Sequence, residues 1–264
     1  MQQRTVARLI RANGIGLASG EPVSVILRPA AVDSGILFRR VDLKPAVQVA
    51  ARLENLRETA DGGVFGREGA QVRGGTPLLA ALAGLGIDNI QLDVTAPELP
   101  LVAGGAGAFA WLVQRAGVRE QGAPRRFLRI RRRVRVTDGR RFAQLEPFDG
   151  FRVDLAPEDG GQGQSMDFSS VPFLSGEQGA FRDAPVPPAA TRGVPGGDAP
   201  GRELLLKQRM LVVLGDLSLL GRSLIGRFQG RAAGGSLTRR LVREVLADPN
   251  AWEEITFAAP TPSL

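Results

Sequence analysis

Residues 74–94, GGTPLLAALAGLGIDNIQLDV, predict a short apolar helix that leads directly into a strand. Thr76 can act as the N-cap, because its hydroxyl accepts a hydrogen bond from an unpaired N–H group of the first turn. Pro77 suits the first helical position, and two glycines end the helix. Residues 87–94 alternate in polarity as a half-buried strand does. Locally, the stretch is a scaffold element without a reactive side chain.

The order of elements predicted for the first half of the chain is repeated in the second half. Residues 1–118 are expected to form a strand-rich domain that ends in helices, the last of them near 106–116. Residues 119–126 are expected to be a linker. Residues 127–264 repeat this order, because RRFAQLEPFDGFRVDLAP resembles VSVILRPAAVDSGILFRR and a long apolar helix follows again. Such a pattern indicates an internal duplication. The predicted fold is α+β, with two similar domains that each pack a layered sheet on helices.

Within the second domain, a segment at about 157–202 is dense in Gly and Pro and lacks periodicity. This composition predicts a flexible segment. Long structureless segments are uncommon in compact domains. The segment is therefore interpreted either as a vestige or as a part that orders on a partner.

The formal net charge is +7, and nearly all of the cationic residues are Arg. Residues 125–136, RRFLRIRRRVRV, would place alternate arginines on one face of a single strand. That face could bind diphosphate, anionic lipid or nucleic acid, or it could be the solvated outer face of a sheet. The solvated face is preferred, and no nucleic-acid partner is expected.

Few reactive side chain types are available, because the 264 residues include no His, no Cys and no Tyr. The commonest general base, every thiolate nucleophile and the soft zinc ligands are therefore missing. Catalysis would depend on Asp, Glu, Lys, Arg, Ser or Thr, and a metal would need oxygen ligands. The sequence has no apolar leader and no apolar run of bilayer length. We therefore expect no transmembrane segment and a cytoplasmic location.

The order of short motifs along the chain resembles the LpxC family, the zinc-dependent UDP-3-O-acyl-N-acetylglucosamine deacetylases of lipid A synthesis in Gram-negative bacteria. The matching motifs cover nearly the whole chain except 157–202. The resemblance implies metal-assisted amide hydrolysis: two His and one Asp hold zinc, a Glu is the general base, and a further His acts on the transition state. The motifs are RTVARLIRANGIGLASG, LRPAAVDSGILFRRVDL, LAALAGLGIDNI, APELPLVAGGAGAF, RVTDGRRF, RMLVVLGDLSLLG with IGRF, and AWEEITF.

The positions to which the resemblance assigns this chemistry carry other residues. Thr76 and Pro77 occupy the places of the general base and the first zinc ligand. Gln208 and Val212 occupy those of the other two ligands, and Gly235 that of the further His. No catalytic residue and no metal ligand is therefore assigned. No cofactor is expected, although the family uses zinc.

Some polar family positions are kept, and others are not. Arg209 stands where the family has a Lys that contacts substrate phosphate, and Arg141 lies near another basic contact of the nucleotide. Each is interpreted as a candidate substrate-binding residue or as a solvated surface charge. Asp216 matches an Asp that orients the distal His. Without that His, the preferred interpretation is a structural carboxylate that bonds to the backbone or pairs with an Arg. Ala18 and Ala103 stand where the family has a His and an Asp.

Three functions are compatible with the sequence. The first is a pseudoenzyme that binds a UDP-sugar or an authentic LpxC-type deacetylase. The second is an active deacetylase-type hydrolase with a non-standard site, built on carboxylates such as Glu98, Asp216 or Glu203. The third is a decayed paralogue without a selected role. The first is preferred, because all the catalytic residue types are lost while the local folding signals agree with one another.

Overall fold

The computed structural model describes residues 1–59, 62–101, 105–158, 161, 163–167 and 199–257. The predicted helix near 106–116 is present with those bounds. The described helices are α1 (Thr76–Gly84), α2 (Ala106–Ala116), α4 (Ala199–Leu217) and α5 (Ser236–Ala247), with the 3-10 turns η1 (Leu53–Asn55) and η2 (Ser218–Leu220).

The first half of the chain forms a six-stranded sheet in the order β10-β2-β3-β9-β4-β5. Strands β4 and β9 run parallel, and the other neighbours run antiparallel. Two smaller sheets, β6-β7-β8 and β1-β11, accompany it. The strands are β1 (Gln2–Val6), β2 (Ile10–Gly16), β3 (Pro22–Pro29), β4 (Ile36–Arg40), β5 (Val47–Ala50), β6 (Leu56–Thr59), β7 (Gly62–Arg67), β8 (Ala70–Arg73), β9 (Ile90–Val94), β10 (Pro100–Leu101) and β11 (Val118–Pro124).

The second half forms a seven-stranded sheet in the order β13-β14-β17-β12-β18, with β15 also paired to β17 and β16 paired to β15. Strand β17 runs parallel to β12 and to β15, and the remaining pairs are antiparallel. The strands are β12 (Arg126–Ile130), β13 (Val134–Asp138), β14 (Arg141–Glu146), β15 (Phe151–Ala156), β16 (Gln164–Asp167), β17 (Ser223–Arg231) and β18 (Trp252–Thr256).

The two large sheets share one pairing scheme. The series β2-β3-β9-β4-β5 corresponds strand for strand to β13-β14-β17-β15-β16. In each series the third and fourth strands run parallel, and the other pairs run antiparallel. Helix α1 precedes β9 as α4 precedes β17. This repeated topology confirms the predicted α+β fold of two similar sheet-and-helix units.

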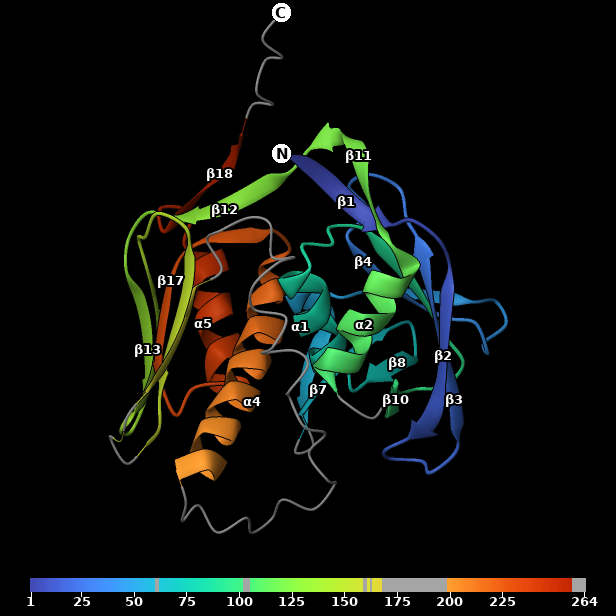
Figure 1. Ribbon diagram of the computed structural model, residues 1–264, viewed down its shortest axis with the longest axis horizontal. Helices are drawn as coiled ribbons and strands as arrows, with labels where there is room; N and C mark the ends of the chain where they lie inside the picture. Colours follow the sequence, from blue (N-terminus) through green and yellow to red (C-terminus); the bar gives the residue numbers. More distant parts are fainter. Residues whose placement is uncertain (60–61, 102–104, 159–160, 162, 168–198, 258–264) are drawn as a thin grey trace, which may run out of the picture.

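The helices form the middle of the molecule. Figure 1 shows them between β13 and β17 on one side and β2 and β3 on the other. Helix α1 packs on α2 and on α4, and α4 packs on α5. An apolar helix suits this place between two layers, and Leu78, Leu79 and Leu82 of α1 are fully buried. None of the described helices has the length and hydrophobicity needed to cross a bilayer.

Helix α1 begins differently from the prediction. Its first residue is Thr76 itself, and Gly75 occupies the N-cap position without a side-chain cap hydrogen bond. The first turn is closed by the Leu79 N–H group, which donates to the Gly75 carbonyl at 2.9 Å. The predicted Thr76 cap is therefore wrong. Backbone geometry and burial, rather than a capping hydroxyl, start this helix.

Residues 119–126, which we expected to form a linker, are mostly in strands. They include most of β11, which pairs with β1, and the first residue of β12. The boundaries of the two predicted domains stay a prediction.

The arginine-rich run 125–136 does not form one strand. Strand β12 ends at Ile130, β13 begins at Val134, and residues 131–133 between them are exposed. Arg125 is buried at 7% exposure. The expected single arginine-lined face is therefore wrong, because the chain turns within the run.

The Gly/Pro-rich segment at about 157–202 lies partly within regular elements. Residues 164–167 form β16, and α4 begins at Ala199. The expectation of flexibility for 168–198 falls outside the described residues.

Helices α1 and α4 approach each other closely at Gly215. A Cβ atom at this position would lie 2.6 Å from the carbonyl oxygen of Thr76 and 2.9 Å from its Cγ2 atom. The contact is with backbone, which cannot rotate away as a long side chain can. Glycine at 215 therefore sets the distance between these two helices.

We predict that Gly215→Ala destabilises the fold by about 1–3 kcal/mol, because overpacking forces the two helices apart. Chemical denaturation followed by circular dichroism measures this free energy of unfolding. Gly122→Ala is the matched control: a Cβ atom there meets nothing within 4 Å. Equal stability of the two variants would contradict the close α1–α4 approach.

Candidate functional site

Several of the positions implied by the family resemblance lie where three helices come together. Thr76 is the first residue of α1, and its backbone carbonyl lies against Gly215 of α4. A Cβ atom on Gly234, just before α5, would lie 3.6 Å from Val212 Cγ1 on α4. The backbone N–H of Gly235 donates to Asp216 Oδ2 at 2.8 Å. Residues far apart in the sequence are thus brought to one junction.

The side chains at this junction differ in exposure and in chemistry. Thr76 is half-buried and Pro77 is exposed. Gln208 is half-buried, and Val212 is exposed at 36%, which is unusual for a valine beside a core. None of these four side chains carries a charge. Apart from Asp216, the junction therefore combines polar and apolar side chains that carry no charge.

Asp216 is the buried charged group of the junction, at 2% exposure. Besides the Gly235 N–H group, Arg239 Nη1 donates to Asp216 Oδ1 at 3.2 Å. Burial raises the pKa of Asp216 to about 7, and Arg239 and the Gly235 N–H only partly offset it. The raised value follows because a carboxylate removed from water is less stable than a neutral carboxyl group.

Arg239 of α5 connects Asp216 to the surface. Its side chain is 7% exposed, and its Nε atom lies 3.6 Å from Glu58 Oε1. Arg243 Nη1, one turn further along α5, donates to the same Glu58 oxygen at 3.1 Å. The backbone and Arg contacts that we expected for Asp216 are both present, but sequence reasoning did not identify Arg239 or Glu58. Only their positions in the fold bring them together with Asp216, and no local spacing announced the contact.

The loop before α5 has a backbone suited to glycine. Gly234 and Gly235 have φ values of 117° and 61°. The Gly234 N–H group donates to Thr238 Oγ1 at 3.0 Å, which holds the loop against the first turn of α5. A side chain at 235 would have to adopt a left-handed conformation, which costs energy for any residue with a Cβ atom.

The two candidate substrate-binding arginines lie on different elements. Arg209 is exposed on α4. Arg141 on β14 is half-buried; its Nε atom donates to the Ala232 carbonyl at 3.2 Å, and its Nη1 atom donates to Asp138 Oδ2 at 3.3 Å. Arg141 is thus fixed against the loop that leads to Gly235. Whether Arg209 and Arg141 contact one ligand stays a prediction.

The other carboxylates considered as catalytic groups lie elsewhere. Glu98 is 4% exposed, and it accepts hydrogen bonds from the backbone N–H groups of Ala18 at 2.8 Å and Ser19 at 3.0 Å. Burial would raise the pKa of Glu98, but the hydrogen bonds from Ser19 and Ala18 hold it below its usual value overall. Glu98 therefore secures the turn after β2. The side chain of Glu203 and all of Ala103 lie outside the described residues.

The fold and the junction together define a class of protein: a duplicated α+β protein whose helices meet between its two large sheets. The family model described as LpxC, UDP-3-O-acyl N-acetylglycosamine deacetylase, matches residues 3–173. The chain belongs to the LpxC family.

Several relatives carry the name UDP-3-O-acyl-N-acetylglucosamine deacetylase. The protein from Hahella chejuensis (strain KCTC 2396) is 39% identical over 97% of this chain and 94% of its own length. The protein from Pseudomonas entomophila (strain L48) is 40% identical over the same shares. The protein from Coxiella burnetii (strain Dugway 5J108-111) is 35% identical over 99% of this chain and 95% of its own length. The similarity therefore covers the whole fold.

Family membership corrects the expectation that this chain uses no cofactor. The family is one of zinc-dependent deacetylases, so zinc is the cofactor that membership indicates. No group of three or more Asp or Glu side chains in the described part of the chain is placed to hold a metal ion. That observation does not exclude a cofactor.

The residues at the family's ligand positions do not fit the family's ligand set. Two imidazoles and one carboxylate are the donors that the resemblance implies. Pro77 and Val212 have no donor atom in their side chains, and Gln208 has a neutral amide. No catalytic step through zinc follows from these residues.

We predict that Asp216 makes the fold less stable as the pH rises from about 4 to about 7. The folded state holds the Asp216 proton up to a pKa of about 7, whereas the unfolded state releases it near 3.8. Between these values the folded state binds more protons, so stability is greatest at low pH, falls through this window and is level above it. The loss is at most about 4 kcal/mol, from about 1.4 kcal/mol per pKa unit.

Asp216→Asn should remove this part of the pH dependence, and denaturation curves from pH 4 to pH 8 measure it. Asp149→Asn, a change at an exposed position, is the control. Parallel stability curves for the wild type and Asp216→Asn would refute the raised pKa.

Proposed function

We propose that this chain is a pseudoenzyme of the LpxC family, a non-catalytic member that binds a UDP-sugar. The observation behind the proposal is the replacement of every catalytic residue type at one helix junction. Thr76, Pro77, Gln208, Val212 and Gly235 stand at the positions implied for the general base, the ligands and the further His. No other part of the chain can supply an imidazole, because the sequence contains no His.

The scaffold around these positions supports a binding role. The Gly215 contact and the Asp216–Arg239 pair hold α1, α4 and α5 together without catalytic groups. Arg141 is fixed near the loop before α5, and Arg209 is exposed on α4. Arginine suits a diphosphate, because its planar guanidinium donates two parallel hydrogen bonds to phosphate oxygens. A cytoplasmic location in a Gram-negative bacterium is part of the proposal.

In an alternative form of this proposal, the chain binds a protein partner instead of a UDP-sugar. An authentic LpxC-type deacetylase is the partner that we would test first, since duplicated family members can associate through related surfaces. The exposed Val212 lies at the junction where such a partner could gain contact with both halves. Co-purification of the two proteins at equal amounts would support this form.

An active deacetylase is a second candidate function, and the comparisons favour it. Relatives named UDP-3-O-acyl-N-acetylglucosamine deacetylase share 35–40% identity with nearly the whole chain. An active site would then have to use carboxylates, arginines or hydroxyl groups in place of imidazole. A decayed paralogue is a third candidate, and failure to give a cooperatively melting protein would favour it.

We predict that the purified protein binds UDP-3-O-acyl-N-acetylglucosamine in a saturable manner. Arg209→Gln and Arg141→Gln should each weaken binding about tenfold, the effect of losing one hydrogen bond to a charged group. Calorimetric titration, with and without added zinc, measures the dissociation constants. Arg11→Gln on β2 and Arg140→Gln beside Arg141 are the matched controls, because both replaced side chains are exposed.

Two results would count against nucleotide-sugar binding. One is the absence of saturable heat in both conditions with a protein that melts cooperatively. The other is equal weakening by the control variants, which would assign the effect to overall charge and not to the two positions.

A further inference from the structure

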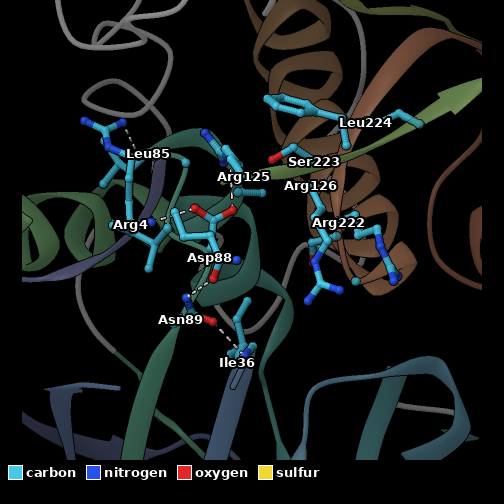
Figure 2. A pocket seen from close by; sticks show the side chains of 18 of the residues that line it. Arg4, Ile36, Leu85, Asp88, Asn89, Arg125, Arg126, Arg222, Ser223 and Leu224 are labelled. Carbon is cyan, nitrogen blue, oxygen red and sulfur yellow. Dashed lines mark hydrogen bonds and ion pairs between the residues drawn. The ribbon is translucent and has the colours of Figure 1, made fainter. Parts of the chain in front are cut away.

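A cavity of about 250 Å³ lies at the C-terminal end of α1, away from the junction at its N-terminus. Residues 83–89 form one wall. The start of β1, the start of β12 and residues 221–224 before and within β17 form another, and the remaining lining comes from residues between 33 and 36, residues 51–52, Phe151 and the end of α4 with η2. Figure 2 shows Arg4, Arg125 and Asp88 together, with Arg126 and Arg222 to the right. Nothing in the family resemblance or in the proposed function uses this cavity.

One guanidinium group and one backbone N–H group share a carboxylate in this cavity. Arg125 Nε donates to Asp88 Oδ1 at 3.0 Å, and the Arg4 backbone N–H donates to Asp88 Oδ2 at 2.8 Å. The side chains of Arg125 and Asp88 are 8% and 17% exposed. Burial raises the pKa of Asp88, although Arg125 and Arg4 act against it. Arg4, Arg125 and Asp88 together therefore carry a net charge of at least +1.

Several guanidinium N–H groups of Arg4 and Arg125 have no acceptor. Arg4 Nε is buried without a hydrogen-bond partner, while Arg4 Nη1 donates to the Leu85 carbonyl at 3.5 Å. No acceptor for the Nη atoms of Arg125 occurs among the residues that the structure describes. A Cβ atom on Gly86 would lie 2.9 Å from Arg125 Nη1, so glycine there leaves room for the guanidinium group. Unpaired buried donors are costly unless a ligand or water satisfies them.

The other two arginines are already paired. Arg126 contacts Asp33, and Arg222 contacts Glu254. They limit the cavity on the side away from Asp88 and add to its positive field. Their side chains are 40% and 33% exposed, whereas that of Arg125 is 8% exposed. We therefore take Arg4 and Arg125, on the Asp88 side, as the binding donors.

The wall also includes apolar side chains. Ile36, Phe127 and Leu224 line the cavity together with carbon atoms of α1. Its volume is slightly below the range of about 300–1,000 Å³ that is typical of small-molecule pockets. A ligand must therefore be compact, with a charged group at one end and an apolar body at the other.

We propose that this cavity binds a small organic anion, in which an oxyanion group pairs with Arg4 and Arg125 and a compact apolar body contacts Ile36 and Phe127. The shared chemistry is the oxyanion, which a phosphate ester or a carboxylate could provide. This inference is independent of the proposed function, because the two sites lie at opposite ends of α1.

Calorimetric titration at low salt tests the proposal with four probes: phenyl phosphate, benzoate, inorganic phosphate and phenol. Phenyl phosphate or benzoate should bind with one-to-one stoichiometry, more tightly than inorganic phosphate or phenol. Whichever of the two binds better identifies the head group. Raising the salt concentration should weaken binding, because ions screen the attraction.

Two variants locate the site. Arg4→Gln removes one cation, and Arg125→Lys keeps the charge beside Asp88 but removes the fork. Each should weaken binding at least tenfold while the thermal melting curve stays cooperative. Arg11→Gln and Arg209→Gln should bind as the wild type does, and Arg209→Gln separates this cavity from the nucleotide-sugar site. No saturable binding of either organic anion, or unchanged binding in a folded Arg4→Gln variant, would overturn the proposal.

Discussion

The contact between α1 and α4 at Gly215 is the constraint on which the rest of the structure depends. Each helix belongs to one of the two repeated units, because α1 precedes β9 as α4 precedes β17. Because glycine lets the backbone of Thr76 approach, the two units share one helical layer. Positions 76, 212 and 235 are then neighbours whatever side chains they carry. The geometry of the junction is therefore held by packing and does not need reactive groups.

Asp216 shows how such a junction is kept stable after its chemical partners change. A buried carboxylate without a partner would destabilise the fold by several kcal/mol. Arg239 Nη1 supplies that partner at 3.2 Å, and the Gly235 N–H group donates to the other carboxylate oxygen at 2.8 Å. Glu58 in turn pairs with Arg239 and Arg243 at the surface. Arg239 therefore lies between two carboxylates. These contacts hold Asp216 in place without any catalytic role.

Local signals in the sequence predicted much of the fold, and contacts between distant residues supplied the rest. The helix at 106–116, the helix-to-strand stretch at 74–94 and the duplication all follow from periodicity and turn residues. The expected linker at 119–126 and the single strand at 125–136 differ from the structure, because pairing with β1 and β18 decides where those strands begin and end.

The candidate site was only partly accessible to sequence reasoning, for the same reason. The resemblance to the LpxC family identified which positions to examine. The Asp216–Arg239 pair and the unpaired donors of Arg4 and Arg125 arise from tertiary contacts, and no spacing along the chain indicates them. The Thr76 cap was expected from its residue type alone, and the backbone at Gly75 made it unnecessary.

The most direct test of the pseudoenzyme proposal is the rate of deacetylation of UDP-3-O-acyl-N-acetylglucosamine by the purified chain. The assay includes zinc, and the relative from Hahella chejuensis serves as the reference at equal protein concentration. The proposal predicts no product above the rate without protein. Zinc-stimulated turnover that follows the amount of this protein would contradict it and identify an active deacetylase without imidazole.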